Sequence, residues 1–169
     1  APAAPTNLEM AATHRGFRQV AQQGHPDFRL LERTPNPKTG RMRSEIVIED
    51  VRAVIDFLHL KPAASPWRVV IVDSADELNV SAANALLKSL EEPPPRALFL
   101  LATSQPSGLL PTIRSRCPRL DLAPLPADDV RRAPEAALAA AGLKAPPADR
   151  WPQLARPSDG SVRAALQLA

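Results

Sequence analysis

Two apolar runs constrain the fold of this chain more than any other feature of its sequence. Residues 69–72 form an unbroken β-branched run, and residues 97–102 form a second apolar run. Such runs are typical of strands buried on both faces of a parallel sheet. The segment between them carries one apolar stripe at helical spacing, formed by Ala83, Leu86, Leu87 and Leu90. The prolines at 93–95 end this helix, so the stretch predicts a strand, a helix and a second parallel strand.

The two ends of this helix contain polar residues that need separate explanations. Ser81 is a candidate N-cap, because its side chain can accept a hydrogen bond from the first turn. We interpret the preceding acidic pair, Asp76 and Glu77, as the start of the helical segment. Glu91 and Glu92 lie at the C-terminal end, where the helix dipole disfavours each anion by about 0.3–1 kcal/mol. Something other than helix stability is therefore expected to account for them.

The first third of the chain predicts further elements of the same kind. Residues 10–23 have loose helical spacing, and residues 28–31 are expected to form a short strand. Residues 32–44 are polar and rich in proline, which predicts an exposed loop. The apolar spacing that follows predicts an amphipathic helix over residues 49–60.

The last part of the chain has a different composition. From Pro124 onward alanine, leucine, proline and arginine predominate. Helical segments are expected near residues 127–141, 148–155 and 161–168. We therefore predict two domains, an α/β core over residues 1–123 and a small helical domain over residues 124–169.

Composition excludes several classes of protein and favours none strongly. The net charge is +3, but the 21 basic and 18 acidic residues are interspersed, and no tyrosine and few other aromatic residues are present for base stacking. The single cysteine, Cys117, excludes an internal disulfide and a cysteine zinc cage within the chain. His14, His25 and His59 have no ligand spacing, so no metal site is predicted. No membrane-spanning run and no signal-peptide layout occur, and we expect a soluble protein of the reducing cytoplasm.

Polar side chains follow both predicted core strands. Asp73 comes directly after the first, and Thr103 and Ser104 follow the second. The carboxyl ends of parallel strands share one edge of a sheet, where α/β proteins bind ligands. Each position also has a plainer interpretation as a strand-end turn or helix cap. No glycine-rich GxxxxGK[ST] loop occurs, so nucleotide binding by this chain alone is not expected.

The order of these motifs resembles the AAA+ core of bacterial clamp-loader ATPases. The resemblance runs from RVVIVDSADELN through NALLKSLEEPPP and LFLLATSQ to IRSRC, and it covers roughly residues 25–168. It implies a parallel α/β AAA+ core followed by a helical lid. The first strand and phosphate loop would precede residue 1, and a collar domain would follow residue 169.

One departure from the active members of that family concerns hydrolysis. They have a glutamate after the strand-end aspartate, which orients the attacking water, whereas this chain has Ser74. A neutral hydroxyl cannot act as that base at pH 7. The pattern resembles the delta-prime type of subunit of DNA polymerase III. It implies an accessory subunit of the polymerase holoenzyme that is not itself an ATPase and needs no cofactor.

The tripeptide Ser115, Arg116, Cys117 resembles the SRC motif of the family. The arginine of that motif enters the ATP site of the neighbouring subunit, which implies that Arg116 acts in trans as an arginine finger. Taken alone, the tripeptide would predict a surface salt bridge. Arg114, two residues earlier, is expected to face elsewhere. Cys117 is interpreted as a small packed hydrophobic residue rather than a nucleophile.

A second arginine matches the lid domain of the family. Gly160, Ser161, Val162 and Arg163 resemble the start of its sensor helix. The resemblance implies a degenerate nucleotide site built from Asp73, Thr103, Ser104 and Arg163. A structural salt bridge is an equal alternative for Arg163.

The resemblance also implies partners. These are the motor ATPase subunits and the delta subunit of a five-membered clamp loader, with the sliding clamp and primed DNA reached through the complex. Two alternatives remain open at this point. The chain can be a truncated active AAA+ ATPase, such as a motor subunit or helicase loader, or a basic DNA-binding module.

Overall fold

The computed structural model of the chain describes residues 10–126, 129–130 and 147. The chain divides into two compact units, Ala1–Arg119 and Leu120–Ala169. All the helices and strands named below belong to the first unit. The helical segments predicted near residues 127–141, 148–155 and 161–168 lie almost entirely outside the described residues, as does Arg163, so the helical lid stays a prediction.

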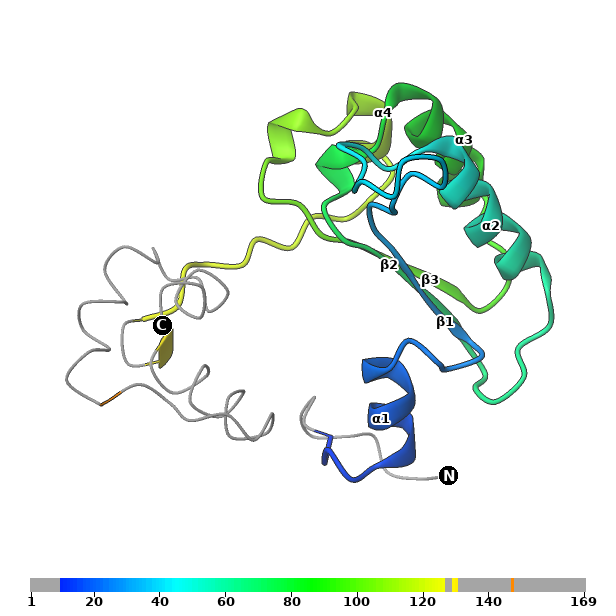
Figure 1. Ribbon diagram of the computed structural model, residues 1–169, viewed down its shortest axis with the longest axis vertical. Helices are drawn as coiled ribbons and strands as arrows, with labels where there is room; N and C mark the ends of the chain where they lie inside the picture. The colour runs from blue at the N-terminus through cyan, green and yellow to red at the C-terminus, as the bar shows by residue number, and fades with distance from the viewer. Residues whose placement is uncertain (1–9, 127–128, 131–146, 148–169) are drawn as a thin grey trace. The chain divides into compact units, whose positions relative to one another are not determined.

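Three parallel strands form the sheet of the first unit (Figure 1). They are β1 (Phe28–Leu31), β2 (Arg68–Val72) and β3 (Ala97–Leu101), and they lie side by side in that order. In the register, Val70 of the central strand pairs with Arg29 and with Phe99. The predicted parallel sheet is confirmed, and each predicted strand agrees with the observed one to within a residue.

Four helices and two single turns connect and flank the strands. The helices are α1 (Arg15–Ala21), α2 (Ile48–His59), α3 (Val80–Glu91) and α4 (Pro111–Arg114), and the 3₁₀ turns are η1 (Ala75–Glu77) and η2 (Pro106–Gly108). Parallel neighbours require a crossover, and α2 joins β1 to β2 while α3 joins β2 to β3. Within the described part of the chain, no helix is both long and apolar enough to cross a membrane.

The core lies between the sheet and the helices α2 and α3. The apolar stripe of α2 is buried, as predicted, and α3 contributes Ala82 and Leu86. These side chains pack against Leu31, Val70 and Val72 on one face of the sheet. Burial of each large apolar side chain stabilises the fold by about 1.5–3 kcal/mol. This layer fixes β2 and β3, and with them the edge of the sheet where the predicted site residues lie.

The other face of the sheet corrects one expectation from the sequence. Both apolar runs predict strands buried on two faces, but Leu98 and Leu100 of β3 are 44% and 48% exposed. In β2, fully buried residues alternate with partly buried ones. The α2 and α3 helices pack on the face that carries Val70, and Leu98 and Leu100 point to the opposite face. An apolar run therefore identified the strands but not how far each face is covered.

The start of α3 is a second correction. Asn79, not Ser81, is the N-cap, and its Oδ1 accepts a hydrogen bond from the backbone N–H of Ala82 at 2.8 Å. Asp76 and Glu77 do not begin this helix, because they form the separate turn η1. Asparagine is as good an N-cap as serine, and here it lies directly before the first helical residue.

A buried aspartate fixes the connection from α2 to β2. Asp27, which precedes β1, is 1% exposed. Its carboxylate accepts hydrogen bonds at 2.7 Å from the backbone N–H groups of Ala63, Ala64 and Ser65. Burial alone would raise the pKa of Asp27, but these donors and the nearby Arg68 together hold that pKa below its ordinary value of 3.8. The carboxylate therefore stays ionised inside the fold.

Arg68, the first residue of β2, completes this buried polar cluster. Its guanidinium donates to the carbonyl groups of Phe57 and Lys61, and its Nη2 lies 4.0 Å from Asp27. The guanidinium also stacks over the ring of Phe57, 4.5 Å from the ring centre, and Arg29 lies at the same distance from that ring. Asp27 and Arg68 thus join α2 to β1 and β2, although no local pattern in the sequence marked either of them.

Candidate functional site

The backbone places the predicted strand-end residues at one edge of the sheet. The N–H of Asp73 donates to the carbonyl of Leu31 at 2.9 Å, and that of Ala102 donates to Val72 at 2.9 Å. Asp73 and Thr103 therefore follow neighbouring strands that end at the same level. This is the edge where α/β proteins bind ligands.

Ser74 has a backbone conformation that few residues adopt. Its φ and ψ are 62° and 63°, in the left-handed region. The next N–H, of Ala75, donates to Ala102 at 2.8 Å, and the carbonyl of Ser74 accepts from Glu77 at 2.8 Å. The chain thus turns sharply at Ser74 into η1 while staying attached to the neighbouring strand.

Thr103 makes its side-chain contacts within the protein. Its hydroxyl donates to Asp76 Oδ1 at 2.5 Å and accepts from the N–H of Gln105 at 3.1 Å. A hydrogen bond from a hydroxyl to a carboxylate is among the stronger ones in proteins. Sequence analysis did not single out Asp76 as a partner of Thr103. The two hydrogen bonds hold the Thr103 side chain within the protein at the end of β3.

The other acidic residue of this turn is also paired. Glu77 Oε2 lies 2.8 Å from Nε of Arg33. Asp76 and Glu77 therefore both contact side chains from other segments. Neither occupies position 74, directly after Asp73, where the active members of the family have their glutamate.

Arg116 lies just after α4, in the turn that ends this helix. Its Nε donates to Oε1 of Glu91 at 2.6 Å, and its Nη2 also pairs with that oxygen. Nη1 donates to the carbonyl of Thr112 at 2.8 Å and to the hydroxyl of Ser115 at 3.2 Å. The side chains of Arg116 and Glu91 are 32% and 46% exposed. The predicted site residue is therefore at the surface, where it forms a salt bridge to the end of α3.

Glu91 is a partner of Arg116 that sequence reasoning did not identify. Part of the signal for this contact lies in the sequence, because a carboxylate at the C-terminus of a helix is unfavourable and its presence needs an explanation. The two residues are 25 positions apart, so no local spacing could pair them. Packing of α3 against α4 brings them together.

The residues beside Arg116 have simpler surroundings. Arg114, the last residue of α4, is exposed. Cys117 is half-buried, and burial raises the pKa of its thiol. The thiol is thus a weaker nucleophile at neutral pH than a free cysteine, in keeping with a packing role.

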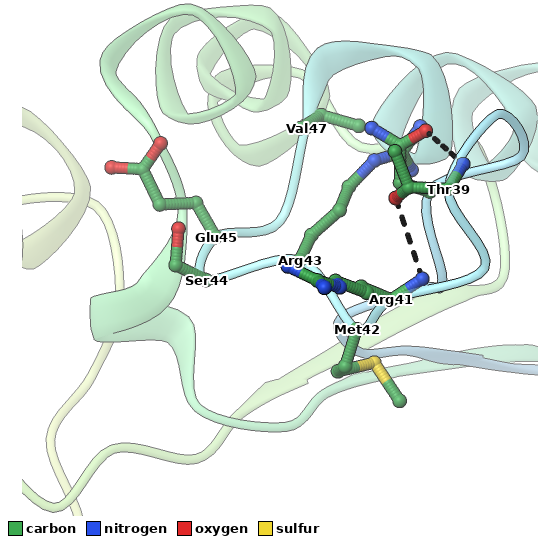
Figure 2. Close-up of a pocket in the computed structure, with 8 residues that line it drawn as sticks. Thr39, Arg41, Met42, Arg43, Ser44, Glu45 and Val47 are labelled. Atoms are coloured by element: carbon green, nitrogen blue, oxygen red, sulfur yellow. Dashed lines mark hydrogen bonds between the residues drawn. The ribbon is translucent and has the colours of Figure 1, made fainter.

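The predicted residues do not meet in a single pocket. An open hollow of about 430 Å³ lies in the loop before α2 (Figure 2), and it is lined by Asn36, Thr39, Arg41, Met42, Arg43, Ser44, Glu45 and Val47. Of the predicted site residues that the structure describes, none lines it. Hydrogen bonds within the loop, such as that from the N–H of Arg41 to the Thr39 hydroxyl at 3.4 Å, account for its shape. Among the described residues, no group of three or more possible metal ligands comes together.

Comparison with known proteins places this geometry in a family. The family model described as "DNA polymerase III, delta subunit" matches residues 5–126, which include every helix and strand named above. The chain belongs to the DNA polymerase III delta subunit family. Its fold is that of an AAA+ core, as the sequence predicted.

Individual members of the polymerase III group show the same relationship. The chain is 42% identical over 98 residues to the DNA polymerase III subunit delta' of Pseudomonas aeruginosa, covering 58% of this chain and 28% of that protein. It is 38% identical over 125 residues to the subunit tau of Escherichia coli, covering 74% of this chain and 19% of that protein. The chain thus spans less than a third of these curated relatives.

A solved structure supports the fold. The crystal structure of a DNA polymerase III gamma subunit-related protein from Thermotoga maritima superposes with a TM-score of 0.60 and 26% identity. The match covers 89% of this chain and 47% of that one. The delta subunit family and this likeness agree on a clamp-loader type of AAA+ core.

Proposed function

We propose that this chain is part of a clamp-loader subunit that does not hydrolyse ATP itself and supplies Arg116 to the ATP site of a neighbouring subunit. The observation that carries the proposal is the position of Arg116. It lies at the surface directly after α4, in an SRC tripeptide, and its contacts are partly exposed to water. Membership of the delta subunit family supports the proposal.

The chemistry of arginine suits this role. The guanidinium keeps its charge at any physiological pH and presents a planar fork of N–H donors to phosphate oxygens. An arginine supplied in trans stabilises the charge that develops on the transferred phosphoryl group. Such a residue is worth about 10³–10⁵ in turnover.

The edge of the sheet supports the non-hydrolysing part of the proposal. Ser74 stands where an active ATPase of this family has its glutamate, and a hydroxyl cannot take that role at pH 7. Asp76 and Glu77 are each held by another side chain. Asp73, Thr103, Ser104 and Arg163 then belong to a degenerate nucleotide site without turnover.

The proposed partners follow from the family. They are the motor ATPase subunits, one of which would receive Arg116, and the delta subunit. The sliding clamp and primed DNA are reached through the complex, in the cytoplasm. The natural protein that contains this chain would act as an accessory subunit of the DNA polymerase III holoenzyme.

The proposal is tested with a clamp loader reconstituted from the natural protein that contains this chain and its partner subunits. Arg116→Ala is expected to lower DNA-stimulated ATP turnover by about 10³-fold at the site that Arg116 faces. Arg114→Ala removes a neighbouring exposed cation and is expected to leave turnover within about twofold. Gel filtration of each complex verifies assembly.

Two results would contradict the proposal. Unchanged turnover in an intact Arg116→Ala complex would leave Arg116 as a structural residue. Turnover of ATP by the natural protein alone would favour the alternative of an active AAA+ ATPase. In that case, Ser74 would not mark a loss of activity.

A further inference from the structure

The contacts of Arg116 within this chain occupy most of the N–H donors that an arginine finger needs to bind phosphate. A guanidinium has five N–H groups. In this structure Nε and Nη2 are engaged by Glu91, and Nη1 is engaged by the Thr112 carbonyl and the Ser115 hydroxyl. These four contacts leave one N–H, on Nη2. Because a bidentate grip on phosphate needs two parallel N–H groups, Arg116 cannot hold phosphate in this way while it holds Glu91.

Glu91 is suited to be replaced by a competing anion. It is the last residue of α3, where the negative end of the helix dipole disfavours a carboxylate, and Arg116 offsets that effect. The pair is partly exposed to water, and exposed ion pairs are weak. A nucleotide phosphate carries more negative charge than one carboxylate, so it can take the guanidinium from Glu91.

We propose that Glu91 is a positioning residue that latches Arg116 against α3 until a nucleotide phosphate of the neighbouring subunit replaces its carboxylate. The inference rests on the proposed role of Arg116 and adds a regulatory partner to it. The ion pair to Glu91 holds the Arg116 side chain against α3 in the unassembled subunit, and bound nucleotide is needed to release it. Loss of the Glu91 contact frees Nε and both N–H groups of Nη2, which supply the two parallel donors that a bidentate grip on phosphate needs.

The test replaces Glu91 in the reconstituted clamp loader. Glu91→Gln keeps the shape of the side chain and removes its charge, so phosphate no longer competes with a carboxylate. We expect KM for ATP to fall about two- to fivefold at low salt, the range set by one exposed ion pair, with kcat unchanged. The difference from wild type should shrink as salt is raised, because screening weakens the latch in the wild-type protein.

Glu92→Gln is the matched control, because it removes the same charge from the adjacent residue. Among the described ion pairs, Arg116 is joined to Glu91 and not to Glu92. Glu92→Gln is expected to leave KM unchanged. The double variant Glu91→Gln/Arg116→Ala should behave as Arg116→Ala alone, and thermal melting should show that every variant is folded.

The possible outcomes separate this inference from the function on which it rests. A fall in kcat for Glu91→Gln comparable to that of Arg116→Ala would show that Glu91 presents the finger, and this would overturn the latch. Equal kinetics for Glu91→Gln and Glu92→Gln would overturn it as well. If Arg116→Ala itself has no effect, the proposed function fails and the latch fails with it. A large loss for Arg116→Ala with no gain for Glu91→Gln removes the latch alone.

Discussion

Asp27 is a buried carboxylate stabilised chiefly by backbone donors. Three N–H groups lie 2.7 Å from its oxygens, whereas the nearest nitrogen of Arg68 is 4.0 Å away. The charge therefore fixes the loop between α2 and β2 directly and orients Arg68 at longer range. Because β2 carries Asp73 and Ser74 at its far end, this cluster helps to set the position of the candidate site.

Replacement of Asp27 is expected to cost a large share of the stability. Asp27→Asn removes the charge and leaves Arg68 buried without its counter-ion, so the free energy of unfolding should fall by about 3 kcal/mol. Urea unfolding followed by circular dichroism measures the change. Asp56→Asn, at an exposed position of α2, is the control and should change stability by less than about 0.5 kcal/mol. A similar small effect for both variants would contradict the role given to Asp27.

The same residue predicts a dependence of stability on pH. Its pKa in the folded chain lies below the ordinary value of 3.8. Its contribution is therefore present in full above that value and is lost as pH falls through the lower, folded pKa. Unfolding measured from pH 6 to pH 2 should show a smaller loss of stability in Asp27→Asn than in the wild-type chain over the range below about pH 4.

The elements of the sheet could be predicted from the sequence to within a residue, and the start of α3 could not. The β-branched and apolar runs decide the strands, because a buried strand needs them whatever surrounds it. The N-cap of α3 depends on which of several polar side chains reaches a backbone N–H of the first helical turn. Asn79 and Ser81 both have suitable side chains, and only the path of η1 selects Asn79.

The N-cap assignment can be checked by a pair of substitutions. Asn79→Ala removes the acceptor for the Ala82 N–H and should lower the free energy of unfolding by about 1 kcal/mol. Ser81→Ala changes the residue that the sequence favoured and should be neutral within about 0.5 kcal/mol, because Ser81 is an exposed residue of the first turn. Thermal melts of both variants give the comparison. A larger loss for Ser81→Ala would reverse the assignment.

At the scale of the whole molecule, the partners of charged residues were beyond the reach of sequence patterns. Arg116 and Glu91 are 25 residues apart, Thr103 and Asp76 are 27 apart, and Asp27 meets Ala63 across 36 residues. Such contacts depend on how helices pack on the sheet, which local spacing does not specify. The candidate residues were named from the order of motifs, which carries no information on their pairings, and their functional roles stay predictions.

These pairings bear on the alternative of a basic DNA-binding module. The ion pairs of the described residues engage Arg33, Arg43, Arg68 and Arg116 with carboxylates. Arginines neutralised in this way contribute little to a positive surface. The 21 basic and 18 acidic residues are also interspersed along the sequence.

We therefore expect the purified chain, measured in the absence of partner subunits, to bind duplex DNA only weakly. Fluorescence anisotropy with a short labelled duplex should give a Kd no tighter than about 10⁻⁶ M at physiological salt. The slope of log affinity against log salt should correspond to few phosphate contacts, at about −0.9 for each. Tight binding with a steep slope would favour the DNA-binding module instead.

The left-handed backbone at Ser74 limits which side chains this position accepts. At φ 62° a glutamate would be strained, since this region suits glycine, asparagine and aspartate far better than longer side chains. A single substitution that places glutamate at position 74 would therefore carry a backbone strain of about 1–2 kcal/mol at this turn. Under the proposed function, the backbone at this position therefore adds to the barrier against regaining hydrolysis by one point mutation.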